Sequence, residues 1–415
     1  MGRNFQKNVQ YYKFSFYGFF KNLRFFEPFL ILFFLEKNIT FFQIGIIYSV
    51  REILINIFEI PSGILADLYG RKKTLISSFI FYIFSFVIFY LTQTFLAFLI
   101  AVIFYALGDA FRTGNHKAMI FEYLRIKGWK DQRAHYYGHT RSWSQIGSAI
   151  SSIIAALIVF YSGQYKSIFI ISVIPYLIDL ALVSTYPKEL DKSNIKQETI
   201  SVKAKFKQIL SEFIISFRKP KILKAIANLS VHSGFHRSIK DYLQPVIQTL
   251  AISLPVLLYY TETQRSSLLI GSIYFIIYIL TSITTRKAGV LRDKLKSVET
   301  ALNLTMYVGF LIALLCGIFF HFGFYLISIL LYVLFYLIEN LRNPIGVEFV
   351  SELYKDEILS TALSLNSQSK SLIAAILAPV LGFLADQYGV GAGLSGLAII
   401  IFITSPIFNV KSIRS

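Results

Sequence analysis

The chain has 415 residues, of which 55% are hydrophobic and only 15% are charged. A soluble globular protein of this length would carry many more charges, so the composition excludes that class. The formal net charge of +18 does not indicate a nucleic-acid partner. The cations collect in alternate loops, where membrane topology and anionic lipid account for them.

Apolar runs long enough to cross a bilayer as helices recur along the whole chain. Their lengths and the breakers between them predict twelve helices, which are residues 14–35, 41–68, 74–91, 95–124, 140–161, 167–186, 222–250 (kinked at Pro245), 266–285, 298–320, 322–353, 358–385 and 391–408. They form an N-terminal bundle (1–186), a cytoplasmic linker (187–220) and a C-terminal bundle (221–415). Apolar residues at helical spacing from Phe206 to Phe217 predict an amphipathic helix at the membrane interface.

Positive charge alternates from loop to loop. Clusters of lysine and arginine follow predicted helices 2, 4 and 8, whereas the other short loops carry few. The positive-inside rule then predicts cytoplasmic termini, in a bacterial-type inner membrane or a plasma membrane. The expected partners are the bilayer, a small-molecule solute and a coupling ion, with no nucleic acid, no cofactor and a monomeric state.

The most informative loop joins predicted helices 2 and 3 and reads Gly63-x-x-x-Asp67-x-x-Gly70-Arg71-Lys72. Its glycines allow two helix ends to meet in a sharp turn. Asp67 ends a helix, where the helix dipole disfavours an anion, so it should have a cationic partner or bind another helix's N-terminus. The pattern predicts a charged latch at a cytoplasmic gate.

This loop resembles the signature loop of the major facilitator superfamily, and the end of predicted helix 11, Ala378-Pro379-x-x-Gly382-x-x-x-Asp386, is also similar to that family. The resemblance implies an all-α integral membrane fold, with twelve transmembrane helices in two pseudo-symmetric six-helix bundles. It also implies rocker-switch transport and a central cavity lined by helices 1, 4, 7 and 10.

Internal repeats support a transporter independently. The matching pairs, in chain order, are Phe25–Pro28 with Tyr242–Pro245, Gly63–Asp67 with Gly289–Asp293, and Asp109–Arg112 with Glu339–Arg342. Repeats in a membrane protein favour a transporter whose substrate binds near the midplane between them. The predicted gate therefore consists of Gly63, Asp67, Gly70, Arg71, Lys72 and, from the second copy, Asp293.

Polar and ionisable residues within the predicted spans are the candidate substrate and coupling residues, because charge in hydrocarbon is costly. These candidates are Arg24, Glu27, Glu52, Asn56, Asp109, Arg112, His116, His236, Arg237, Lys240, Asp241, Glu339 and Arg342. Low-dielectric surroundings favour a neutral carboxylic acid, so Glu27, Glu52 and Asp109 are candidates to carry a proton. Arg24, Arg112 and Arg237 would bind an anionic group or compete for a carboxylate.

A structural interpretation competes with this one. Asp109–Arg112 and Glu339–Arg342 are spaced i, i+3 and could be intrahelical ion pairs that only make burial tolerable. Glu122 and Glu352, nearer the cytoplasmic ends, are interpreted as gate or loop contacts. For the whole set of buried charges, a purely structural role is the less favoured interpretation.

The favoured hypothesis is a proton-coupled secondary transporter of a small polar or ionisable solute, with an organic anion preferred. A multidrug or organic-cation:proton antiporter is the alternative, although Ser142–Ser152 lacks the glycine- and proline-rich pattern that antiporter branches of the family have in helix 5. An alternative of another class is a membrane metalloprotein using the i, i+4 pairs His135/His139 or His232/His236. The sequence contains no phosphate-binding Gly-Lys-Ser/Thr motif or nucleophile elbow, so we expect neither ATP-driven transport nor an enzyme.

Overall fold

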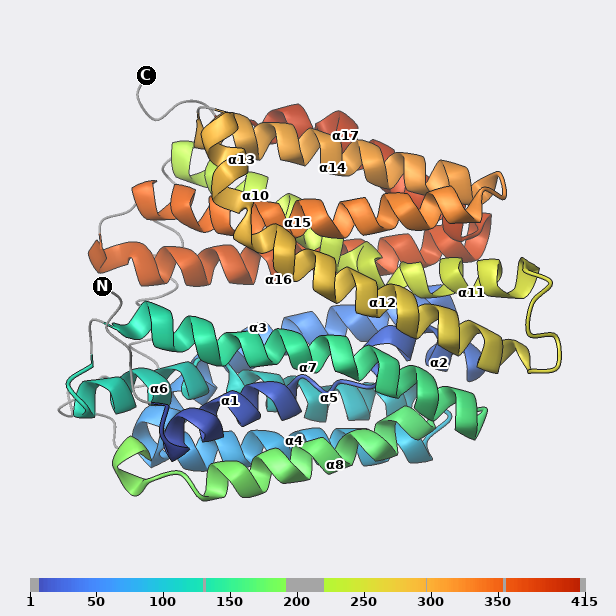
Figure 1. Cartoon of the computed structure of the whole chain (residues 1–415). Helices are drawn as coiled ribbons and strands as arrows, with labels where there is room; N and C mark the ends of the chain where they lie inside the picture. Colours follow the sequence, from blue (N-terminus) through green and yellow to red (C-terminus); the bar gives the residue numbers. More distant parts are fainter. Residues whose placement is uncertain (1–6, 130–131, 192–219, 296, 354–355, 411–415) are drawn as a thin grey trace. The chain divides into compact units, whose positions relative to one another are not determined.

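The computed structural model describes residues 7–129, 132–191, 220–295, 297–353 and 356–410, and these residues form helices and no strand (Figure 1). Two compact units contain them. Unit 1 comprises Met1–Phe29, Leu54–Val202 and Ile270–Tyr278, and unit 2 comprises Leu30–Ile53, Lys203–Leu269 and Ile279–Ser415. The predicted amphipathic linker helix lies outside the described residues.

Unit 1 is built on aromatic packing between long helices. Its elements are α1 (Val9–Lys21), η1 (Glu27–Phe29), the second part of α3 (Phe41–Tyr69), α4 (Arg71–Leu91), α5 (Phe95–Arg112), α6 (Asn115–Ile126), α7 (Arg133–Ser162), α8 (Ser167–Ser184) and η3 (Lys188–Asp191). In Figure 1, α4 and α8 run side by side. Tyr176 of α8 packs edge-on against Tyr82 and Phe86 of α4, and such contacts stabilise beyond the apolar area they bury.

Unit 2 contains the C-terminal helices. Its elements are α2 (Leu30–Glu36), the first part of α3, α10 (Pro220–Ile239), η4 (Lys240–Tyr242), α11 (Leu243–Ser253), most of α12 (Glu262–Arg286), α13 (Ala288–Lys294), α14 (Val298–His321), α15 (Tyr325–Leu353), α16 (Asp356–Tyr388), α17 (Val390–Thr404) and η5 (Ser405–Phe408). Small residues allow α14 and α17 to approach closely, since a Cβ on Gly317 would lie 2.5 Å from the Gly391 carbonyl oxygen.

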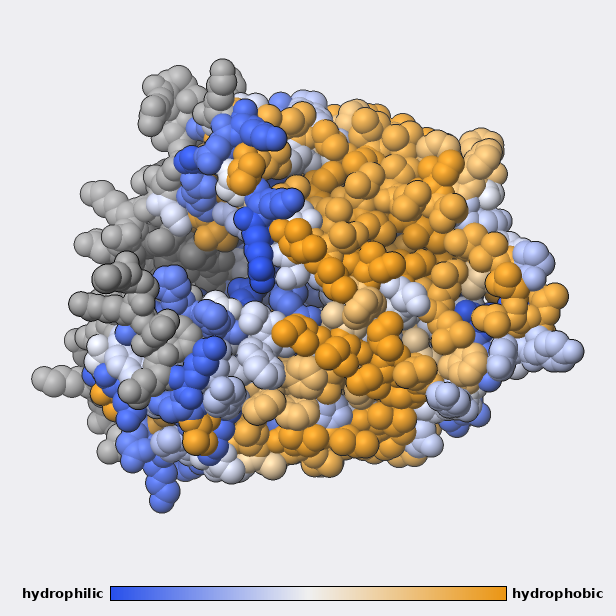
Figure 2. Space-filling model, viewed as in Figure 1, coloured by the Kyte–Doolittle hydropathy of each residue, from blue (hydrophilic) through white to orange (hydrophobic). Residues whose placement is uncertain are grey.

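The described residues include ten helices that are long and apolar enough to cross a membrane. Many apolar side chains on them face outward, among them Phe84, Ile376 and Ile403, which are 54%, 66% and 69% exposed. Figure 2 shows the same pattern, with apolar residues over the middle of the helices and hydrophilic ones toward their ends. Exposed apolar surface on this scale is typical of lipid contact, so the chain is a multi-pass membrane protein.

Two predicted spans are interrupted rather than continuous. Predicted helix 1 breaks into α1, residues 22–26 without helix, η1 and α2, and predicted helix 7 breaks at η4 between α10 and α11. A proline follows each break, Pro28 and Pro245, and proline cannot donate the hydrogen bond that would continue a preceding helix. The Gln244 side chain accepts a hydrogen bond from the Ile31 N–H at 2.8 Å, which satisfies one donor in the first turn of α2.

Predicted helix 4 is also divided, because α5 ends at Arg112 and α6 begins at Asn115. Gly114 stands between them with φ +80°, a conformation that glycine adopts without steric cost. The remaining boundaries differ by a few residues, except that α7 begins at Arg133 instead of residue 140. The short helix α13 was not predicted.

The predicted turn at Gly70 depends on glycine for two reasons. Its φ is +103°, and a Cβ would lie 2.4 Å from an Asp191 carboxylate oxygen. That oxygen accepts a hydrogen bond from the Lys72 N–H at 2.7 Å, so Asp191 caps the first turn of α4. The Lys72 ammonium in turn donates to the Tyr186 carbonyl at 2.9 Å.

Gly70→Ala is therefore expected to destabilise the protein by about 1–3 kcal/mol, the usual cost of forcing a side chain into such a conformation. Thermal unfolding can be followed with a thiol-reactive dye, because Cys316 is the single cysteine and is buried. Gly63→Ala is the matched control. A Cβ on Gly63 meets nothing within 4 Å, so its melting temperature should not fall. Equal melting temperatures for both variants would contradict this account of Gly70.

Candidate functional site

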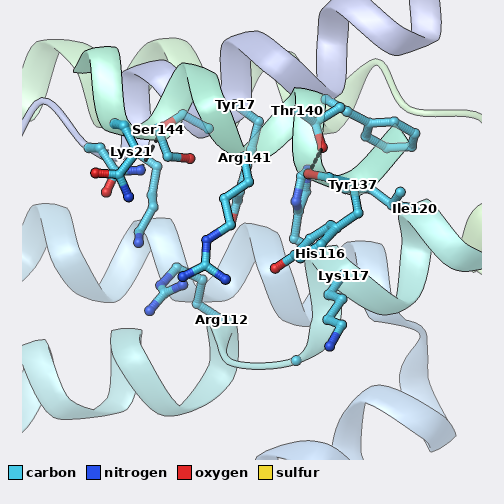
Figure 3. Close-up of a pocket in the computed structure, with 15 residues that line it drawn as sticks. Tyr17, Lys21, Arg112, His116, Lys117, Ile120, Tyr137, Thr140, Arg141 and Ser144 are labelled. Carbon is cyan, nitrogen blue, oxygen red and sulfur yellow. Dashed lines mark hydrogen bonds between the residues drawn. The ribbon is translucent and has the colours of Figure 1, made fainter. Parts of the chain in front are cut away.

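A cavity of about 380 Å³ lies within unit 1, between α1, α6 and α7 and beside the end of α5. Four cationic side chains line it: Lys21 from α1, Arg112 from α5, Lys117 from α6 and Arg141 from α7. Figure 3 shows Lys21, Arg112 and Arg141 extending toward a common space. The described residues that line the cavity include no aspartate or glutamate, so its local charge is strongly positive.

Close packing of α1 on α7 brings Lys21 and Arg141 to the same cavity. A Cβ on Gly18 would lie 2.7 Å from the Ser144 hydroxyl oxygen, and one on Gly147 would lie 2.5 Å from the Phe19 carbonyl oxygen. Only glycine permits such an approach at both points. Small residues of α7 therefore set the distance between the two helices.

Arg112 is held at the edge of the cavity by a short hydrogen-bond network. Its guanidinium donates to the Asp109 carboxylate at 2.8 Å and to the Tyr82 hydroxyl oxygen at 3.0 Å. The Tyr82 hydroxyl donates to the same carboxylate oxygen at 2.5 Å. The predicted i, i+3 pair between Asp109 and Arg112 thus exists. Because Arg112 also lines the cavity, it can reach a bound anion as well as Asp109.

An aromatic stack forms another part of the cavity lining. The rings of Tyr17 and His116 lie 3.6 Å apart between centroids with an interplanar angle of 11°. The His116 Nε2 is 3.2 Å from the Tyr186 hydroxyl. Gly114 directly precedes α6, and the stack holds the start of α6 against α1. His116 and Arg112 line one cavity.

A second cluster of predicted residues lies in unit 2. The Glu52 carboxylate pairs with Arg51 at 3.0 Å and with Arg237 at 3.1 Å. Arg237 also donates to the Ser371 hydroxyl oxygen at 2.8 Å. Glu52 is only 7% exposed, and the two arginines compensate its buried charge.

Glu339 and Arg342 are both buried but do not form the predicted i, i+3 pair. Glu339 is 2.8 Å from His232 Nδ1 and accepts hydrogen bonds from the Ser233 hydroxyl at 2.7 Å and the Asn343 amide at 3.1 Å. Arg342 instead donates to acceptors on α10 and α14, namely the Asn228 carbonyl and side chain, the Leu302 carbonyl and the Thr305 hydroxyl. Each side chain joins α15 to other helices, so spacing along one helix did not predict the partners.

The remaining predicted substrate residues, apart from Asn56, lie at or near the helix breaks. Arg24 and Glu27 fall within the interruption of the first span, and the Arg24 Nε is buried without a hydrogen-bond partner among the described residues. Lys240 and Asp241 form η4, with 3.7 Å between ammonium and carboxylate. His236 packs against Phe335 and Tyr336. Asn56 is half-buried in α3.

The predicted gate residues make the contacts expected of charged helix ends. Arg71 lies 3.8 Å from Asp67, which gives the aspartate the cationic partner its position requires. In the second copy, Arg292 lies 3.0 Å from Asp293 and 2.8 Å from Glu348. Their function as a gate stays a prediction.

Neither predicted histidine pair is part of a larger donor set. Across the ranges that the structure describes, no group of three or more His, Cys, Asp or Glu side chains is placed to hold a metal ion. His232 is engaged by Glu339, and a Cβ on Gly309 would nearly touch its Nε2. That histidine is packed into the helix interface.

Sequence reasoning missed residues that matter to the unit 1 site, namely Tyr17, Lys21, Tyr82, Lys117 and Arg141. It also missed the buried Asp179 of α8 in the same unit. Lys21 and Asp179 lie inside or at the end of apolar runs, so the same rule that selected Arg24 could have found them. Arg141 falls in the first turn of predicted helix 5, whereas the helix begins earlier in the structure. Tyr17 and Tyr82 carry no signal in a chain with 26 tyrosines.

The fold and the buried charges define a polytopic helical carrier, and similarity to known proteins gives its family. Residues 14–372 match the model of the Major Facilitator Superfamily. The chain belongs to this superfamily, and it is a transporter rather than an enzyme.

It is 22% identical over 393 residues to the uncharacterized MFS-type transporter YxaM of Bacillus subtilis (strain 168), covering 93% of this chain and 91% of YxaM. It is 24% identical over 224 residues to the uncharacterized MFS-type transporter MJ1560 of Methanocaldococcus jannaschii, covering 52% and 55% of the two chains.

Solved structures show the same fold. The nucleoside transporter NupG superposes with a TM-score of 0.74 at 14% identity, covering 97% of this chain and 98% of that one. A POT family transporter in complex with a thioalcohol-conjugated peptide superposes with a TM-score of 0.69 at 16% identity, covering 96% and 95%. The predicted fold of twelve transmembrane helices in two pseudo-symmetric bundles is thus confirmed.

Proposed function

We propose that this transporter carries a small organic anion by alternating access and couples its movement to protons. The observation that supports the anion is the cavity of unit 1, lined by Lys21, Arg112, Lys117 and Arg141. Charge-assisted hydrogen bonds from such groups are among the strongest that proteins offer an anion. An organic cation would meet four like charges there, so the cavity disfavours the alternative substrate class.

The remaining lining residues suit a polar organic molecule rather than a bare ion. Asn22, Thr140, Ser144 and Gln145 provide amide and hydroxyl groups, and the Tyr17–His116 stack provides a flat aromatic surface. Ligand sites typically combine a few placed polar groups with aromatic walls. We therefore favour an anion of a few carbon atoms with one or two carboxylate or phosphate groups.

Arg112 provides a physical link between anion binding and an acid within the membrane. Its guanidinium binds Asp109 and the Tyr82 hydroxyl oxygen. A bound anion competes for the same donors, which weakens the hold on Asp109. A carboxylate that loses its cationic partner in a low-dielectric site gains affinity for a proton. Competition between the anion and Asp109 for Arg112 is therefore our reason for proposing proton coupling. Glu27 and Glu52 are further candidates for the same role.

We also propose that Asp67–Arg71 and the Arg292–Asp293–Glu348 cluster close the cytoplasmic side, with both termini cytoplasmic. Their contacts lie at helix ends rich in lysine and arginine, as the positive-inside rule requires of cytoplasmic loops. Ion pairs at such ends can break and re-form at modest cost.

The test is uptake into liposomes that contain the purified protein and a pH-sensitive dye. Succinate, citrate, glycerol phosphate and benzoate would be compared with tetraphenylphosphonium and with neutral sugars. We expect one or more anions to enter together with a change in internal pH, and the cations and sugars to have no effect. Dye signals driven only by tetraphenylphosphonium would refute the anion proposal. Anion uptake without any pH change would refute proton coupling alone.

A further inference from the structure

Asp179 of α8 is a buried carboxylate outside the cavity lining. It is 0% exposed, and neither carboxylate oxygen has a hydrogen-bond partner among the described residues. An ionised carboxylate with no donor costs several kcal/mol in a low-dielectric interior. A side chain placed so unfavourably in a membrane span is a candidate for a functional role.

The packing of α8 on α1 directs Asp179 toward the cavity residues. The Tyr176 hydroxyl is 3.4 Å from the Lys21 carbonyl oxygen, and the Tyr186 hydroxyl is 3.4 Å from the Lys13 carbonyl oxygen. Asp179 follows Tyr176 by three residues within α8, so the two side chains share one helix face. That face meets α1 between Lys13 and Lys21, where Tyr17 is located.

Several ionisable groups surround Asp179. Lys21 and Tyr17 of α1 and Tyr186, which follows α8, are close enough to interact with it electrostatically. The Tyr17 hydroxyl is buried and, within the described ranges, lacks a hydrogen-bond partner. From α4, the ring of Tyr82 packs on Tyr176 at 5.1 Å. From α6, His116 lies 3.2 Å from the Tyr186 hydroxyl, and α7 contributes Arg141 to the cavity that Lys21 lines.

Asp179 differs in its partners from two of the acids that the sequence singled out. Asp109 accepts hydrogen bonds from Arg112 and Tyr82, and Glu52 is held by two arginines. Lys21 lies at the end of the α1 face that α8 meets, since the Tyr176 hydroxyl is 3.4 Å from its carbonyl oxygen, and its side chain lines the anion cavity. Lys21 is thus the cation of the cavity that lies where α8 meets α1.

We propose that Asp179 takes up the coupling proton of this transporter, and that Lys21 alternates between the ionised Asp179 and the anion in the cavity. The inference rests on the proposed anion transport. When an anion binds, Lys21 turns to it, and Asp179 takes a proton from water, which removes its unpaired charge. When the anion leaves, Lys21 returns and the proton is released.

The first test needs no substrate. Infrared difference spectra of the protein in liposomes, recorded between acidic and alkaline pH, detect the C=O stretching band of a carboxylic acid. We expect loss of a band in Asp179→Asn and its retention in Glu122→Gln, which neutralises an acid of the same unit that is paired with Arg125 and does not line the cavity. A band shifted in frequency in Asp179→Glu would support the assignment. A spectrum of Asp179→Asn identical to that of the wild type would overturn it.

The second test uses whichever anion of the liposome panel the wild type transports. Asp179→Asn should lose uptake driven by a pH gradient but keep exchange of labelled for unlabelled anion, because exchange needs no net proton movement. Uptake that remains coupled to pH in this variant would overturn the inference while leaving anion transport intact. If the wild type moves no anion, the proposed function fails and the infrared result still decides whether Asp179 binds a proton. Cys316 labelling during heating shows whether each variant is folded.

Discussion

Arg141→Met is expected to lower the affinity for the transported anion by roughly ten- to a hundredfold. A hydrogen bond from a charged group contributes about 1.5–3 kcal/mol, and each 1.4 kcal/mol is a factor of ten. Arg141 lines the cavity and has no carboxylate within 4 Å among the described residues, so its guanidinium is available to an anion. The half-saturation concentration for uptake measures the effect. Arg141→Lys should restore part of it, because charge returns without the planar donor fork.

Arg125→Met is the matched control for this experiment. Arg125 is also on a helix of unit 1, but its guanidinium binds Glu122 at 2.6 and 2.9 Å and does not line the cavity. Its removal should leave anion affinity unchanged. If the two variants weakened uptake equally, a general effect of positive charge would explain both, and the cavity would lose its assigned role.

Arg342→Met should destabilise the protein strongly, by roughly 3 kcal/mol or more, because each buried acceptor left without its donor costs about 1–3 kcal/mol. Arg342 is 1% exposed and donates to acceptors on α10 and α14. Without it, the Asn228 and Leu302 carbonyls and the Thr305 hydroxyl oxygen lose a donor inside the protein. Thermal unfolding followed through Cys316 measures the change.

Arg292→Met provides the comparison. Arg292 has the same charge and pairs with two acids, Asp293 and Glu348, but its side chain is 38% exposed. Exposed ion pairs contribute about 0–1 kcal/mol, so the melting temperature should change little. A large loss for both arginines, or for neither, would show that burial does not determine what these networks contribute.

The sequence predicted most of the fold because its dominant signal is physical and local. Length and apolarity give a membrane helix directly, and α3, α4 and α14 therefore begin and end within a few residues of their predicted bounds. The interruptions of the first and seventh spans were harder to predict. Pro28 and Pro245 mark both places, but whether a proline kinks or breaks a helix depends on which neighbours satisfy the freed backbone groups.

The candidate site was only partly predictable for a related reason. Asp109 and Arg112 pair at i, i+3 as their spacing predicted, and Arg112 and His116 line one cavity although the break at Gly114 places them on different helices. Lys21 and Arg141 come from other helices, and their approach depends on Gly18 and Gly147, whose role becomes visible only when α1 and α7 are packed. Glu339 and Arg342 show the opposite case. Their spacing predicted an ion pair between them, but Glu339 contacts α10 and Arg342 contacts α10 and α14 instead.

The contrast between Arg112 and Arg342 also bears on how a duplicated protein evolves. The two residues occupy equivalent places in the repeats, yet one borders a cavity and the other is enclosed by hydrogen bonds within its unit. Once a duplicated arginine becomes part of the internal framework, selection for folding fixes it, and it is no longer free to follow a change of solute. The copy beside the cavity keeps that freedom. Changes in substrate preference among descendants of this chain should therefore accumulate in the first repeat, while the second diverges mainly by substitutions that preserve its packing.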